Sequence, residues 1–223
     1  MPPSPRSVVG YRETLLRCAI ALLVGAGATA ACVLWVDRPV AEFVHRHDIP
    51  RFVVLKWITL VPPAIQMWAP GLLVLLALRR LAGPLRPWER TVLAATVALL
   101  IAIQFKNTLK DCFGRTWPIG WVSDVPGLIP EGAYGFHPFH GGMGFASFPS
   151  GHTVRVVAIV AALWAAWPRS RIPGVLATLA IAVALIGMDY HFVGDVVAGG
   201  VVGGVVGAVT ARCVAPGATS GLK

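Results

Sequence analysis

Long apolar runs dominate this sequence and constrain its fold more than any other feature. A bilayer core about 30 Å thick is crossed by roughly 20 apolar residues in a helix, within a range of about 17–25. Runs of about this length recur along the chain, at residues 15–36, 64–78, 91–109, 153–167, 172–188 and 193–211. We therefore expect an all-α, polytopic membrane protein in which six transmembrane helices form one bundle.

The amino-acid composition supports this interpretation. Hydrophobic residues make up 56% of the chain and charged residues only 13%, against about 25% charged in a typical soluble domain. So few charges cannot cover a water-exposed surface, and lipid must cover much of it. We expect residues 1–223 to form a single membrane domain. The first run has the charge layout of a signal peptide, but an uncleaved anchor keeps the number of spans even.

The net charge of +9 is explained by membrane orientation rather than by nucleic-acid binding. The arginines gather in short segments between apolar runs, where the positive-inside rule places them, and no basic stripe is interleaved with aromatic residues. We expect these segments and both termini to face the cytoplasm from a plasma (inner) membrane. The outer, periplasmic side then carries the long loop 111–148, between spans three and four, and the turn around His191.

Prolines and glycines refine the predicted spans. Residues 40–56 are charged and interrupted by Pro50, which predicts a short amphipathic segment at the membrane interface. We expect Pro62-Pro63 to break the chain, so that the second span begins at Ala64. In the last span, glycines recur every four residues on one helix face, which predicts a close approach by another helix backbone. These glycines are Gly199, Gly203 and Gly207.

Three polar clusters fall on the predicted outer side: Lys110–Pro118, Ser147–His152 and Asp189–Asp195. The second leads into an apolar run, with Ser150 as a good N-cap and His152 in the first helical turn. Free backbone N–H groups and the positive end of the helix dipole make such a turn an anion site. An imidazole there is well placed to protonate a leaving oxygen.

The third cluster places His191 and Asp195 four residues apart, and therefore on one helix face. A carboxylate that accepts from one ring nitrogen fixes the tautomer and leaves the other nitrogen free to attack. The first cluster adds Lys110 and Arg115, donors suited to the charge spread over a phosphoryl group. A nucleophile, an acid in His152 and a cationic clamp together indicate phosphoryl transfer.

At these motifs the sequence resembles the type 2 phosphatidic acid phosphatase superfamily. The family pattern is Lys, six residues, Arg-Pro; then Pro-Ser-Gly-His; then Ser-Arg, five residues, His, three residues, Asp. Pro149–His152 matches the second element fully. The resemblance implies that His191 is the nucleophile that forms a phosphohistidine, that Asp195 orients it and that His152 protonates the leaving group. It also implies a mechanism without metal or cofactor, and phosphate binding by Lys110, Ser150 and Gly151.

Two arginines of the family pattern are absent. Trp117 stands where the first motif has Arg, and Ala184-Leu185 stands where the third has Ser-Arg. Charged hydrogen bonds are worth about 1.5–3 kcal/mol each, so anion binding needs replacements. We predict as further phosphate ligands Arg115, in the loop of Trp117, and Arg155, one turn after His152.

The remaining polar residues of the outer loops have alternative interpretations. His137 and His140 would join the two catalytic candidates in a zinc or copper site, but the proline between them does not suit helical ligand spacing, and no metal is expected. Asp189 either tunes His191, pairs with Arg155 or is a solvated turn residue.

The sequence therefore predicts a membrane phosphatase that hydrolyses a lipid phosphate or lipid diphosphate at the outer leaflet. A lipid phosphotransferase would pass the same intermediate to another acceptor. A non-catalytic lipid-phosphate-binding protein would result if loss of both arginines had ended turnover. A haloperoxidase-like enzyme is disfavoured, because it needs no path for a substrate in the membrane. The feature that separates catalysis from binding is whether Arg115 and Arg155 converge on the gap between His152 and His191.

Overall fold

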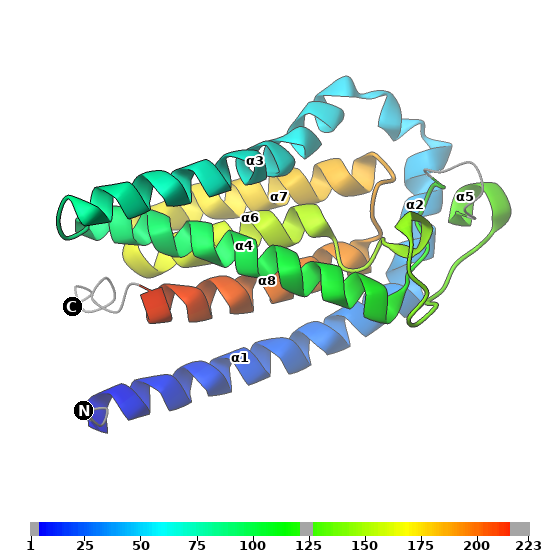
Figure 1. The fold of residues 1–223 in the computed structure, drawn as a ribbon. Coiled ribbons are helices and arrows are strands. Elements are labelled where there is room, and N and C mark those ends of the chain that lie inside the picture. Colours follow the sequence, from blue (N-terminus) through cyan, green and yellow to red (C-terminus); the bar gives the residue numbers. More distant parts are fainter. Residues whose placement is uncertain (1–4, 121–126, 215–223) are drawn as a thin grey trace.

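Long helices that run along one common axis make up most of the molecule (Figure 1). The computed structural model describes residues 5–120 and 127–214, and within these ranges the chain forms helices and loops without a β-strand. The long helices are α1 (Pro5–Ala31), α3 (Val53–Leu81), α4 (Pro87–Phe113), α6 (Gly151–Ala166), α7 (Arg171–Gly187) and α8 (Val193–Val214).

Five helical segments of the described chain are long and apolar enough to cross a membrane. The predicted span at 153–167 corresponds to α6, which is apolar but has only 16 residues. A helix of that length rises about 24 Å, less than a bilayer core of about 30 Å. The five segments are Arg12–Arg46, Val53–Leu81, Pro87–Phe113, Pro168–Gly187 and Val193–Val214.

The first half of the chain differs from the prediction in one respect. Helix α3 begins at Val53 and contains Pro62 and Pro63 in its interior, so the expected break before Ala64 is wrong. In lipid only a helix satisfies the backbone of a spanning segment, and nearby hydroxyls compensate for lost bonds.

The segment after the first span is helical and continuous with it. Helix α1 passes through a π-helical turn, Cys32–Val36, into α2, Asp37–Arg46. The buried side chains of α2 are spaced four and three residues apart, as expected for an amphipathic helix. They are Asp37, Ala41 and Val44. A 3₁₀ turn, Ile49–Arg51, then connects to α3.

Small residues allow α6 and α8 to pack closely. A Cβ at Gly199 would lie 2.7 Å from the backbone oxygen of Ser150, and one at Gly203 would lie 2.6 Å from that of Val154. The predicted close approach of a second backbone is therefore confirmed, and that backbone belongs to α6. Alanines from α4 complete this core beside α6 and α8, namely Ala95, Ala98 and Ala102.

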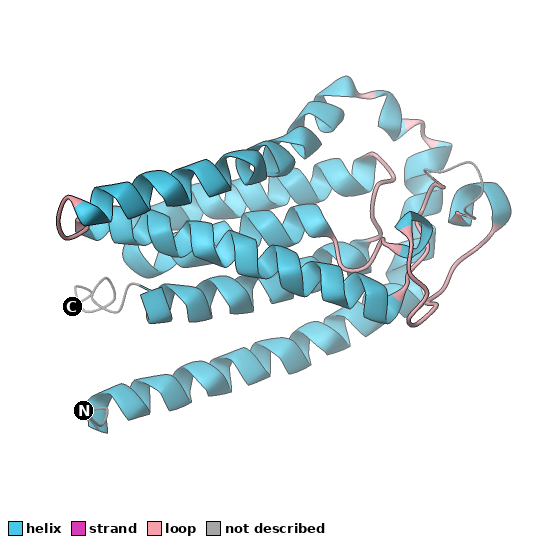
Figure 2. Cartoon of the chain, in the orientation of Figure 1, coloured by secondary structure: helices cyan, strands magenta, loops and turns pink. Residues whose placement is uncertain are grey.

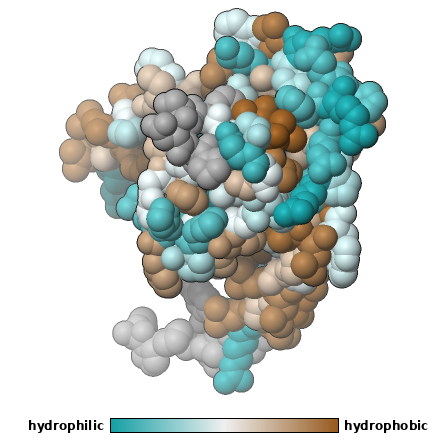
Figure 3. Space-filling model, turned by 90° about the vertical axis from the view of Figure 1, so that its right-hand side faces the viewer, coloured by the Kyte–Doolittle hydropathy of each residue, from teal (hydrophilic) through white to brown (hydrophobic). Residues whose placement is uncertain are grey.

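The alternating helix directions bring several helix ends together. The end of α4, the start of α6, the end of α7 and the start of α8 meet near α2, and most loops lie there too (Figures 1 and 2). The start of α1 and the end of α8 lie at the opposite end of the bundle. Hydrophilic residues gather on the end that carries α2 and the loops (Figure 3).

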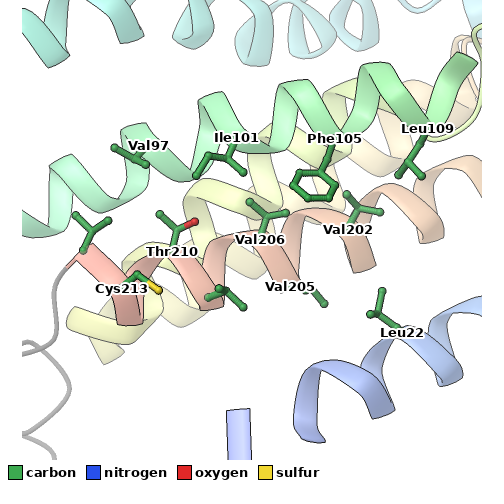
Figure 4. Close-up of a pocket in the computed structure, with 12 residues that line it drawn as sticks. Leu22, Val97, Ile101, Phe105, Leu109, Val202, Val205, Val206, Thr210 and Cys213 are labelled. Atoms are coloured by element: carbon green, nitrogen blue, oxygen red, sulfur yellow. The ribbon is translucent and has the colours of Figure 1, made fainter. Parts of the chain in front are cut away.

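Helix α1 diverges from the other helices toward its N-terminus (Figure 1). A cavity of about 520 Å³ lies between α1, α4 and α8, and its walls are almost entirely aliphatic and aromatic (Figure 4). Its lining includes Leu22, Phe105, Val202 and Val206. No predicted site residue lines it, so this cavity is separate from the predicted site.

Candidate active site

The end of α4 turns the chain back into the protein. Gly114 has a φ of 57° and donates its N–H to the backbone oxygen of Lys110, at 2.9 Å. A Cβ at this position would overlap the carbonyl group of His137, so only glycine fits the left-handed turn. As a result the next side chain, Arg115, points inward and is 0% exposed.

Two carboxylates hold the Arg115 guanidinium. Nη1 donates to Oδ1 of Asp195 and Nη2 to Oδ2 of Asp37, each at 2.6 Å. Nη2 also donates to the hydroxyl of Tyr134, at 2.9 Å. Burial opposes the charge, but Asp195 and Asp37 outweigh it and raise the pKa of Arg115. Both terminal nitrogens are thus engaged with protein groups, and Arg115 lies behind Asp195.

Asp195 is fully buried, and its carboxylate accepts hydrogen bonds from several groups of the site. Its Oδ2 accepts from the hydroxyl of Ser147 at 2.6 Å and from the backbone N–H of Phe192 at 3.1 Å. The same oxygen lies 3.4 Å from Nδ1 of His191. The predicted pair of His191 and Asp195 is therefore brought together, with the carboxylate fixed from several sides.

His191 lies in the short connection between α7 and α8. The backbone oxygen of Leu185 accepts from the N–H groups of Tyr190 and His191, at 2.9 and 3.4 Å. Burial lowers the pKa of the imidazole, and the hydrogen bond to Asp195 opposes that shift. A ring with a lowered pKa is neutral near pH 7, the state in which one nitrogen keeps its lone pair.

The start of α6 places the second histidine. Ser150 is the N-cap, as predicted, and its hydroxyl accepts from the N–H of Thr153 at 3.5 Å. The N–H of Ser150 donates to the backbone oxygen of Asp195, at 3.0 Å. This bond ties the start of α6 to the start of α8, so the ring centroids of His152 and His191 are 6.1 Å apart.

Three cations surround the first turn of α6. Lys110 donates to the backbone oxygen of Ala146. A Cβ added at Gly151 would lie 3.1 Å from Nη1 of Arg155 and 3.6 Å from Nζ of Lys106. Of the two predicted replacement cations, Arg155 therefore approaches the site beside Gly151, whereas Arg115 is engaged behind Asp195.

The two positions that lack the family arginines contribute no charge. The centroid of the Trp117 ring lies 5.0 Å from the centroid of the His191 ring. Nζ of Lys110 lies 5.2 Å from the same Trp117 centroid. Its Nε1 donates to the backbone oxygen of Met143, at 2.8 Å. Leu185 is fully buried in an apolar cluster with Ile181. Trp117 is thus a wall of the site, and Leu185 belongs to the core.

The other polar candidates lie at the edge of this arrangement. Asp189 is 1% exposed and lies 3.7 Å from Nδ1 of His45; burial raises its pKa to about 6, although His45 opposes the shift. Asp189 is therefore not a solvated turn residue.

His137 and His140 pack against Phe145, with ring centroids 4.9 and 4.3 Å away. No group of three His, Cys, Asp or Glu suited to a metal occurs in the described ranges.

Sequence reasoning missed four side chains that shape the site: Asp37, Lys106, Tyr134 and Ser147. One of them had a signal, because Lys106 is an ionisable residue inside a predicted span, four residues before Lys110, and such residues are functional suspects. Asp37 had none, since its partner Arg115 is 78 positions away.

A comparison with protein-family models identifies the superfamily of the chain. The model of the PAP2 superfamily matches residues 91–217. The chain belongs to this superfamily. The match confirms the resemblance predicted from the motifs, and it covers most of α4, all of α6, α7 and α8, and the three polar clusters. Comparisons with curated proteins and with solved structures gave no match. Membership in the PAP2 superfamily indicates a phosphatase that acts on phosphate esters.

Proposed function

We propose that this protein hydrolyses a lipid phosphate at the membrane surface through a covalent phosphohistidine. The observation that carries the proposal is the buried pair of His191 and Asp195, 3.4 Å apart, with the His152 ring 6.1 Å from that of His191. Nucleophile, orienting carboxylate and acid lie within one site, beside three cations, as phosphoryl transfer requires.

In the first step Nε2 of His191 attacks phosphorus. Asp195 accepts from Nδ1–H, which fixes the tautomer and leaves the lone pair on Nε2. The N–P bond forms while the P–O bond to the lipid breaks, and His152 gives its proton to the leaving oxygen. In the second step water attacks phosphorus, the N–P bond breaks, and His152 takes the proton from water. The products are the lipid alcohol and inorganic phosphate.

The oxygens of the reacting phosphate are bound, in this proposal, by Lys110, the hydroxyl of Ser150 and the N–H group of Gly151, with Arg155 on the far side of Gly151. The start of α6 supplies the positive end of a helix dipole there. For Arg115 the geometry favours a different role from direct phosphate binding. Because its two terminal nitrogens bond to Asp195 and Asp37, it holds the carboxylate that orients His191.

The lipid nature of the substrate is inferred from the surroundings of the site. It lies where the ends of membrane-length helices meet. An apolar cavity of about 330 Å³ lies deeper in the bundle, between α3, α4 and α6. Its lining includes Ile65, Leu99 and Ile159. A soluble phosphate ester would need no such surface, whereas a hydrocarbon chain gains about 0.8 kcal/mol per buried methylene.

The site is proposed to face the outer side of the plasma (inner) membrane. The opposite end carries the arginine-rich connection from α3 to α4, where Arg79 pairs with Glu89 at 3.1 Å. An excess of arginine in short connections is typical of cytoplasmic loops. This orientation gives the enzyme access to lipid phosphates of the outer leaflet.

Phosphate release from a panel of lipid phosphates and diphosphates tests the proposed function. The detergent-purified wild type and the His191→Ala variant are assayed side by side, each with and without a chelator. We expect release that disappears in the variant and survives the chelator. A folded wild-type protein that binds these lipids but releases no phosphate would refute the proposed hydrolase activity and favour a binding protein. Transfer of the phosphate to an added lipid alcohol instead of water would identify a phosphotransferase.

A further inference from the structure

Two cations lie deeper in the bundle than the proposed catalytic groups. Helix α4 runs toward the site, and Lys106 precedes Lys110 by four residues, about 6 Å along the axis. Helix α6 runs away from the site, and Arg155 follows His152 by three residues, about 4.5 Å. Lys106 and Arg155 therefore form a second cationic level, on the side toward the middle of the membrane.

This pair has no carboxylate partner among the described residues. Lys106 is 9% exposed and has no hydrogen bond or ion pair within the described ranges. Arg155 donates through Nε to the side-chain oxygen of Gln66, which is uncharged. Nη1 of Arg155 and Nζ of Lys106 both lie beside Gly151, at 3.1 and 3.6 Å from the position of a Cβ added there. Buried like charges are costly unless an anion neutralises them, so this arrangement is suited to bind one.

The groups around the pair follow one another in order along the helix axes. His191 is outermost, followed by His152 with Lys110, and then by the pair of Lys106 and Arg155. The apolar cavity of about 330 Å³ between α3, α4 and α6 comes next. It continues the helix faces that carry the two cations, because its lining includes Ile159, four residues beyond Arg155, and Leu99, seven before Lys106. A lipid tail in this cavity would lie along the same faces of α4 and α6 as the two cations.

We infer that Lys106 and Arg155 bind the lipid-linked phosphate of a lipid diphosphate and select diphosphates over monophosphates. The inference rests on the proposed function, since it assumes that the terminal phosphate is attacked by His191. In a lipid monophosphate, uncharged carbon would lie at this second level and leave both cations unneutralised. In a diphosphate the second phosphate occupies it, while the tail continues into the apolar cavity.

The reaction then has a leaving group that the pair stabilises. Nε2 of His191 forms a bond to the terminal phosphorus, and the bond from that phosphorus to the bridging oxygen breaks. The electron pair stays on the bridging oxygen, which becomes part of a lipid monophosphate next to Lys106 and Arg155. Water later cleaves the N–P bond and releases inorganic phosphate. A phosphate leaving group depends less on protonation by His152 than an alkoxide does.

The test compares two substrates with one tail, farnesyl diphosphate and farnesyl monophosphate, on the full chain in detergent. We expect Lys106→Met to lower kcat/KM for the diphosphate about 10- to 100-fold, the worth of one charged hydrogen bond, and for the monophosphate by less than about threefold. Lys106→Arg should restore most of the loss. Lys56→Met, which removes an exposed cation near the start of α3, should change neither rate.

The outcomes separate the two proposals. Release of phosphate from neither substrate by the wild type would refute the proposed function itself. Parallel losses on both substrates in Lys106→Met would overturn the inference, because the lysine would then serve any phosphate. The Tm of Lys106→Met is the folding control, because the variant replaces an unpaired buried charge by an apolar side chain of similar length. We expect the Tm to stay the same or rise.

Discussion

At the scale of single residues, the site depends on how firmly Asp195 is held. Ser147 lies 2.6 Å from Oδ2 of Asp195 and is fully buried. Ser147→Ala removes one hydrogen bond to a charged acceptor, worth about 1.5–3 kcal/mol. We expect kcat to fall about tenfold or more, measured as phosphate release. The matched control is Ser170→Ala, whose hydroxyl bonds to the backbone of Trp167 outside the site; an equal loss there would contradict the role of Ser147.

The protonation state of His191 gives a second prediction. Burial lowers its pKa below the ordinary value of about 6.5, and the nucleophile must be neutral. The rate kcat/KM should therefore persist on acidification to pH 6.5 and decline only below it. Asp195 raises the His191 pKa, so Asp195→Asn should move this decline to still lower pH while reducing the maximal rate. A decline centred above pH 6.5, or a shift upward in the variant, would contradict the assignment.

The predictability of the site also differs from residue to residue. The four-residue spacing predicted the pairing of His191 with Asp195 but not its form, because His191 lies two residues before the start of α8 and not on a helix face. The N-cap role of Ser150 was equally local. The partner of Arg115 was not, since Asp37 lies in α2 and no periodicity connects the two segments. Arg115 was predicted to replace a phosphate ligand, but such a prediction from a loop cannot anticipate a buried carboxylate.

At the scale of elements, Asp37 joins three parts of the molecule. Its Oδ1 accepts from the N–H of Gly194 at the start of α8, at 2.8 Å, and its Oδ2 accepts from Arg115. Asp37→Ala leaves a buried guanidinium half-paired, which costs about 3–5 kcal/mol. We expect a clearly lower Tm in detergent. Glu42→Ala, which breaks an exposed pair with Arg46 in the same helix, should leave the Tm nearly unchanged, and equal effects would argue against this role.

The elements themselves were predictable to different degrees. The last two helices match their apolar runs closely, α7 at Arg171–Gly187 and α8 at Val193–Val214, because hydropathy alone defines them. Helix α3 was predicted too short, since Pro62-Pro63 ends a helix in water but is tolerated within a membrane. The loop 111–148 has no periodicity, so its left-handed turn at Gly114 was not predictable from pattern.

At the scale of the whole molecule, the arrangement separates chemistry from lipid. Most loops lie at the polar end of the bundle (Figures 2 and 3), while the long helices expose large hydrophobic side chains such as Leu23, Leu75 and Leu176. The cavity beside α1 has no charged residue in its lining, whereas Lys106 and Arg155 lie beside Gly151 at the start of α6. This distribution agrees with the proposed function, in which the tail of the substrate would lie in the membrane and its phosphate at the surface.

The central claim is that His191 carries the phosphoryl group during turnover. The most direct measurement uses a lipid phosphate labelled with ³²P that the wild type hydrolyses, followed by a rapid alkaline quench and peptide mapping. We predict an acid-labile, base-stable label on the peptide that contains His191, absent in His191→Ala. The label should accumulate in His152→Ala when the leaving group needs no proton, because the base for hydrolysis is missing. Hydrolysis that continues in His191→Ala, or a label on any other residue, would contradict the account.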